Sequence, residues 1–87
     1  MKNEVFFLER KKKVLRIKSD DNGCLIFDAD GNMSEGNKMA FKILKHMAKG
    51  KNHNQISEDI SVEYNIPSTM VLKDINDLDS MMKELGW

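Results

Sequence analysis

Apolar side chains recur at helical spacing in the last quarter of the chain. Five of them follow one another at intervals of four, three, four and three residues: Val71, Ile75, Leu78, Met82 and Leu85. On a helix of about 3.6 residues per turn, this spacing places them all on one side. The pattern predicts a helix over residues 68–85 with one buried face.

The residues at both ends of this segment support the prediction. Pro67 fixes φ just ahead of the helix, Ser68 can act as its N-cap, and Gly86 allows the chain to turn after the last residue. Because its apolar stripe is the longest in the chain, we expect this helix to pack across both the sheet and the other helices.

Two shorter helices are predicted before it. Asn37 can cap a helix over residues 38–48, and Asn52 and Gln55 have the spacing of a capping box that opens another helix, ending near residue 64. The first of these helices carries an apolar stripe of Ala40, Ile43, Leu44 and Met47.

Short runs of strand-forming residues occupy the first half of the chain. Residues 14–18 and 24–28 are rich in aliphatic side chains, and each run is followed or preceded by Asn-Gly or Asp-Gly turn signals. Residues 32–35 can form a third strand. Because this strand is short and polar, we expect it to lie at an open edge of the sheet.

The first thirteen residues allow two interpretations. Residues 5–8 form an apolar run that is consistent with an extra strand or with a packed arm. The basic run over residues 10–13 fits a solvated, flexible linker better than an arm that contacts phosphates.

The order of these elements predicts an α+β domain that spans residues 1–87. Its expected architecture is winged-helix-like, with a three-stranded antiparallel sheet followed by three helices, βββααα. A chain of 87 residues buries only about 60 to 65% of its unfolded surface, so we expect a small core and no deep cleft.

The composition is typical of a folded domain that works in water, with 40% hydrophobic and 32% charged residues. No apolar run approaches the roughly 20 residues that span a bilayer. The N-terminal apolar run is too short for a signal peptide. We therefore expect a cytoplasmic monomer that does not act at a membrane.

Candidate catalytic and metal-binding residues are few. Cys24 is the only cysteine and is expected to be a small buried strand residue, and His46 and His53 lack a second ligand at a metal-binding spacing. Glycine-rich phosphate loops and the nucleophile elbow are absent from the sequence. The sequence predicts a protein that is not an enzyme and that binds no metal or cofactor.

Charge alternates in blocks along a chain whose net charge is zero. The blocks 1–18, 19–37, 38–51 and 52–87 carry +5, −5, +5 and −5. The last predicted helix is anionic, whereas a helix that enters duplex DNA needs basic and amide side chains. We therefore expect no nucleic-acid partner. The alternative is a winged-helix nucleic-acid binder that uses the basic N-terminal segment.

Binding through the backbone remains as the favoured function. An open edge strand offers unpaired N–H and C=O groups to an extended peptide. A groove between the third strand and the last helix would have the width of a peptide. An adaptor whose open edge pairs with a second copy is a further alternative.

The pattern Asn37-x-x-Ala40-x-x-Ile43-Leu44, together with the later spacing Asp74-Ile75-x-x-Leu78-x-x-x-Met82, resembles the PqqD-like family. This family includes the small protein of pyrroloquinoline quinone biosynthesis and the recognition elements for precursor peptides that are made on the ribosome and then modified. The resemblance covers roughly residues 14–87 and also includes Gly50, residues 56–64 and Gly86.

The resemblance implies a module without catalytic activity. In the family, the leader segment of a precursor peptide adds as a strand to the third strand and lies against the third helix. The module then presents it to a modifying enzyme, such as a radical-SAM enzyme, a cyclodehydratase, a dehydratase or a leader peptidase. Carried over by position, the peptide-binding residues are Met33, Ser34, Glu35 and Gly36 on the strand and Leu72, Ile75, Asn76, Asp79, Met82 and Lys83 on the helix.

Two positions depart from the family pattern. Gly36 stands where the family has an apolar residue, which would remove a core side chain and loosen or bend the strand. Asp79 stands where an apolar residue is common. It is expected either to pair with a basic residue of the leader or to be exposed to solvent.

Overall fold

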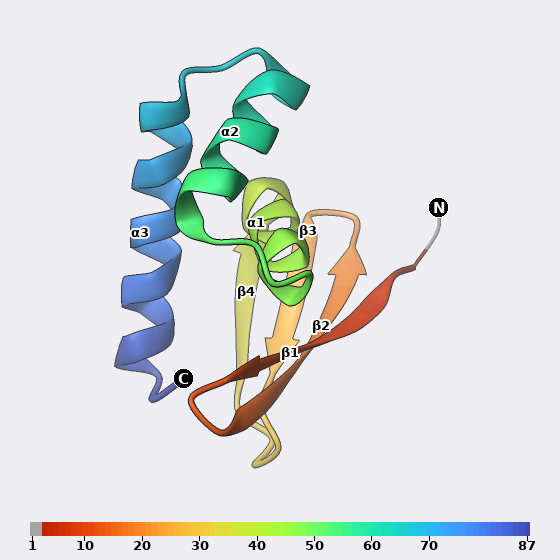
Figure 1. Cartoon of the computed structure of the whole chain (residues 1–87). Helices are drawn as coiled ribbons and strands as arrows, with labels where there is room; N and C mark the ends of the chain where they lie inside the picture. Colours follow the sequence, from red (N-terminus) through yellow and green to blue (C-terminus); the bar gives the residue numbers. More distant parts are fainter. Residues whose placement is uncertain (1–2) are drawn as a thin grey trace.

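Four strands come first in the chain and three helices follow, with the helices gathered on one face of the sheet (Figure 1). The structure is a computed structural model that describes residues 3–87. The elements are β1 (Val5–Arg10), β2 (Lys13–Asp20), β3 (Gly23–Phe27), β4 (Met33–Asn37), α1 (Lys38–Ala48), α2 (His53–Tyr64) and α3 (Ser68–Glu84). The predicted α+β class is confirmed, and so is the antiparallel sheet with three helices.

The sheet has one more strand than predicted. Its order is β1-β2-β3-β4, and every neighbouring pair is antiparallel. The additional strand β1 contains the apolar run near the N-terminus, and it turns Phe6 and Leu8 toward the helices opposite Ile17 and Leu15. The predicted three-stranded sheet is therefore wrong, because β1 adds a fourth strand.

The basic segment after β1 is a tight turn and not a flexible linker. Lys11 and Lys12 have φ values of 50° and 66°, and Arg10 pairs directly with Lys13. Positive φ at both central residues is the geometry of a type I′ turn, which usually selects Asn and Gly. Because two lysines replace these residues, no turn signal is visible in the sequence at this position.

Helix α1 is the element that covers the sheet. It packs on all four strands, and its Ile43 and Leu44 are buried against sheet residues such as Leu15, Ile17 and Ile26. Helix α3 packs on α2 and α1 instead, and no Cα atom of α3 lies within 8 Å of one in any strand. The expectation that α3 packs on the other helices is therefore confirmed. Helix α1, and not α3, covers the sheet, and α3 reaches the strands through side chains such as Met81 at Ser34 and Asp79 at Arg10.

The predicted helix caps are confirmed at two of three helices. The Asn37 side chain accepts a hydrogen bond from the Ala40 N–H at 2.8 Å. Asn52 and Gln55 form a reciprocal capping box, with hydrogen bonds of 2.8 and 3.0 Å. At α3 the cap is Pro67 and no side chain bonds the first turn, so Ser68 is a helical residue and not the N-cap.

Within residues 3–87, no helix combines the length and apolar character that crossing a bilayer requires.

Gly36 allows α1 to approach the sheet closely. It pairs with Cys24 in the β3–β4 ladder, and a Cβ atom on Gly36 would lie 2.9 Å from the Cys24 Sγ and 3.0 Å from the Ala40 Cβ. The Cys24 thiol is buried, as predicted, and burial raises its pKa to about 11. Cys24 and Ala40 therefore fill the space that a side chain at position 36 would occupy. The expected loosening or bending of the strand is not seen, because Gly36 pairs in register with Cys24.

Gly36→Ala should destabilise the fold by about 1–3 kcal/mol, because a methyl group enters a space that is already filled. In a Cys24→Ala background, which removes the Sγ atom, the same substitution should cost clearly less. The measurement is urea unfolding of the two single variants and the double variant, analysed as a double-mutant cycle. Equal costs in both backgrounds would show that the thiol is not the obstacle.

Candidate functional site

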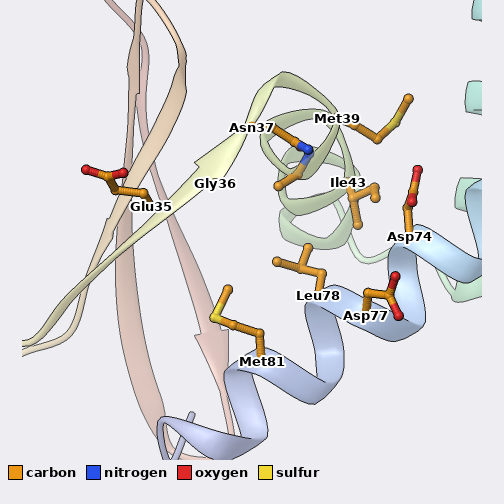
Figure 2. A pocket seen from close by; sticks show the side chains of 10 residues that line it. Glu35, Gly36, Asn37, Met39, Ile43, Asp74, Asp77, Leu78 and Met81 are labelled. Carbon is orange, nitrogen blue, oxygen red and sulfur yellow. The ribbon is translucent and has the colours of Figure 1, made fainter.

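A groove lies between the edge strand β4, the start of α1 and the length of α3 (Figure 2). Its volume is about 260 Å³. The residues that line it come from these three elements and are Glu35, Gly36, Asn37, Met39, Ala40, Ile43, Asp74, Asp77, Leu78 and Met81. The groove thus has a backbone wall on one side and a helix on the other.

The wall formed by β4 presents unpaired backbone groups. The hydrogen bond from the Asp28 N–H to the Asn32 carbonyl, 3.0 Å long, marks a bonded pair at the start of the β3–β4 ladder. Bonded and non-bonded pairs alternate along an antiparallel ladder. Ser34 and Gly36 therefore bond to β3, whereas the N–H and C=O groups of Glu35 point to the open edge.

The floor of the groove is apolar. Ile43 of α1 and Leu78 of α3 are buried beneath it, and the Met81 side chain extends from α3 toward β4 (Figure 2). The Ser34 hydroxyl donates to the Met81 sulfur at 3.6 Å. Methionine is flexible enough to change its rotamer when another group enters.

The rim of the groove is acidic. Asp74 and Asp77 lie along α3, while Glu35 belongs to β4 and turns its side chain away from the floor (Figure 2). Lys and Arg are absent from the lining. Within residues 3–87, none of these three carboxylates lies within 4.0 Å of a basic nitrogen.

The predicted strand residues lie at the expected edge. Glu35 and Gly36 line the groove, and Ser34 faces the same side as the helices. Met33 is about half exposed on the outer face of the sheet, where it pairs with Phe27. Two of the four predicted strand residues therefore line the groove, Ser34 contacts Met81 of α3, and Met33 lies on the outer face.

The predicted helix residues lie elsewhere. Ile75 and Met82 are fully buried core residues. The other four occupy the flank of α3 that does not line the groove: Leu72, Asn76, Asp79 and Lys83. The groove-lining flank carries Asp74, Asp77 and Met81 instead, together with Leu78 from the buried stripe. Both flanks border the same stripe, and only the direction in which α3 crosses α1 decides which of them faces β4.

Asp79 is held by partners within the chain. Its carboxylate accepts a hydrogen bond from Arg10 and lies 3.4 Å from the Lys83 ammonium. Burial raises the pKa of Asp79, but the hydrogen bond and charge of Arg10, with those of Lys83, outweigh it and hold the pKa below its ordinary value. Asp79 is therefore neither a solvated residue nor a groove residue.

The role of Trp87 could not be predicted from the sequence. Its ring is fully buried, its indole N–H donates to the Asp28 carboxylate at 3.1 Å, and its carbonyl accepts from the Arg10 Nε at 2.8 Å. These contacts tie the chain after α3 to the β1–β2 turn and to the β3–β4 loop. We call Arg10, Asp28, Asp79 and Trp87 the C-terminal clamp.

Comparisons of the chain with family models, with curated proteins and with solved structures gave no match. Among residues 3–87, no three His, Cys, Asp or Glu side chains gather in a way that could hold a metal ion. The groove and its open strand are thus the features from which a function can be argued.

Removal of Arg10 should weaken the clamp. Arg10→Met keeps much of the apolar stem but leaves the largely buried Asp79 carboxylate without its main partner, which should cost about 1–3 kcal/mol of unfolding free energy. The control is Lys83→Met, because this side chain is 61% exposed and should contribute less than about 0.5 kcal/mol. Urea unfolding of both variants tests the expectation, and equal losses would contradict it.

Acid should weaken the clamp through Asp28. The Asn32 side chain, the Trp87 indole and two backbone N–H groups lower the pKa of Asp28 from 3.8 to about 2, against partial desolvation. Since the folded pKa is depressed, this stabilisation is present above pH 4 and is lost as the pH falls toward 2. Asp28→Asn should therefore be less stable than the wild type at pH 7, and the difference should shrink between pH 4 and pH 2.

Unfolding curves at pH 7, 4, 3 and 2.5 measure this difference. Asp21→Asn makes the same change of side chain at an exposed position in the β2–β3 turn, away from the clamp, and is the matched control. A difference between wild type and Asp28→Asn that stays constant from pH 7 to pH 2.5 would contradict the assignment.

Proposed function

We propose that this protein is a non-catalytic module that binds the leader segment of a ribosomally synthesised precursor peptide. The leader adds as a strand to β4, lies against α3, and is presented in this position to a modifying enzyme such as a radical-SAM enzyme, a cyclodehydratase or a leader peptidase. The observation that carries the proposal is the open β4 edge inside a groove whose other wall is a helix.

The open side of β4, on which no strand of the described chain pairs, supports this mode of binding. An added strand lies about 4.8 Å from its neighbour. The Cα atoms of β4 and α3 are more than 8 Å apart throughout, so only side chains occupy the space between them. Met81 crosses this space at the Ser34 end and has to swing aside when the peptide enters.

The resemblance to the PqqD-like family supports the same site from the sequence. The spacing from Asn37 through Ala40 to Ile43 places Asn37 as the cap of α1 and the other two in the groove lining. In the family this position follows the strand that the leader pairs with. The strand that the resemblance implies for leader pairing is therefore β4, the same strand that borders the groove.

A nucleic-acid binder is the second candidate because Lys11 and Lys12 form the exposed tip of the β1–β2 hairpin. Arg10, however, is engaged with Asp79 and Trp87, and the groove is rimmed by carboxylates. Duplex phosphates are repelled by such a rim. The geometry therefore favours a peptide over a nucleic acid.

A proline at the open edge tests strand addition. Glu35→Pro removes an N–H that faces the groove and should leave the β3–β4 ladder intact, as proline does on edge strands. It should lower leader affinity about fivefold or more, since one hydrogen bond is lost and the ring obstructs pairing. Glu35→Ala is the matched control, because it removes the same side chain and keeps the N–H.

The titration uses labelled protein, synthetic leader segments of candidate precursor peptides, and amide chemical shifts as the readout. Shifts should concentrate at residues 33–37 and along residues 74–81. Ser34→Pro, whose N–H bonds to β3, should unfold the edge strand even without peptide. Equal affinities of Glu35→Pro and Glu35→Ala, or shifts at residues 5–9 on the opposite edge, would overturn the proposal, and a duplex that shifts Lys11 and Lys12 would favour the second candidate.

A further inference from the structure

Three carboxylates lie around one groove whose lining contains no Lys or Arg. Asp59, Glu63 and Asp79 each form an ion pair with a lysine or an arginine. Glu35, Asp74 and Asp77 form none within residues 3–87, although all three lie around one groove. The groove therefore concentrates negative charge that the rest of the described chain does not neutralise.

The positions of these carboxylates match the two faces of a strand added to β4. Side chains of a strand alternate between the two faces of the sheet. Those that point toward the helices would cross Leu78 and Met81 and reach Asp74 and Asp77 on α3. Those that point to the outer face would lie beside Glu35, as a cross-strand neighbour does.

Lysine and arginine fit both faces. On the inner face their methylene stems can lie along the apolar floor while the charged end reaches Asp74 or Asp77, which a shorter polar side chain cannot do. On the outer face the charged end can pair with Glu35. An acidic segment would meet like charge on both faces and would be rejected. Floor and rim together thus select a long basic side chain.

We propose that the groove takes an extended peptide with Lys or Arg on both of its faces, the inner ones paired with Asp74 and Asp77 and the outer ones with Glu35. This inference rests on the proposed strand addition and names the class of leader that the site accepts. The occupant is a basic peptide, and acidic or uncharged leaders are excluded or weakly bound.

Three synthetic peptides test the inference. The first is acetyl-Gly-Lys-Lys-Leu-Val-Lys-Lys-Gly-amide, in which each face has an apolar residue between two lysines. The other two replace every Lys by Gln or by Glu. In amide-shift titrations the Lys peptide should bind at residues 33–37, the Gln peptide should bind more weakly, and the Glu peptide should not bind. Added salt should weaken the Lys peptide most.

Paired variants test the carboxylates themselves. The double variant Asp74→Asn/Asp77→Asn should lower the affinity for the Lys peptide about three- to tenfold, since two partly exposed charge pairs are lost. The matched control is Glu58→Gln/Glu84→Gln, which makes the same change in net charge at exposed positions outside the groove. The control should change the affinity by less than about twofold.

The outcomes separate this inference from the proposed function. Binding of the Gln or Glu peptide at residues 33–37 as tightly as the Lys peptide overturns the basic preference and leaves strand addition standing. Failure of all three peptides to shift β4 overturns the inference, and the proposed function falls as well only if leader segments also fail to shift β4. Shifts of β4 that grow with protein concentration alone, and that disappear in K11Q/K12Q, would show that the basic hairpin of a second copy fills the groove, which also overturns the inference.

Discussion

The separation of α3 from β4 is the constraint on which the rest of the structure depends. Two sets of contacts maintain it. At one end α1 fills the space over the sheet, so that α3 packs on α1 and α2. At the other end the C-terminal clamp fixes Trp87 to Arg10 and Asp28. Because α3 is held at both ends, the span between them can stay apart from the strand without collapsing onto it.

An open edge strand is a hazard for a small protein, since it can pair with any exposed strand. Here β4 is only five residues long and carries the charge of Glu35. The carboxylates on α3 add to that protection, because an uncharged strand that enters the groove leaves them unpaired in a partly enclosed space. The features proposed to select an occupant are therefore also those that would discourage self-association.

The helices could be predicted from the sequence because periodicity and caps act locally. The stripe of α1 and the capping box of α2 needed no knowledge of the fold. The strand β1 was uncertain because its hairpin turn is made of two lysines. The flank of α3 that lines the groove could not be predicted for a different reason. Hydrophobic spacing identifies the buried stripe, but it does not distinguish between the two flanks on either side of that stripe. Trp87 gave no signal, since a single aromatic residue has no period.

Asp79 and Asp77 illustrate what tertiary structure adds to such a pattern. They are two residues apart on one helix and have the same chemistry. Asp79 faces the C-terminal clamp, and its charge is neutralised by Arg10 and Lys83. Asp77 faces the groove and lies within 4.0 Å of no basic nitrogen in residues 3–87. The charge of Asp79 is thus used within the fold, whereas the charge of Asp77 is left facing the groove, and hydrophobic spacing alone does not distinguish the two.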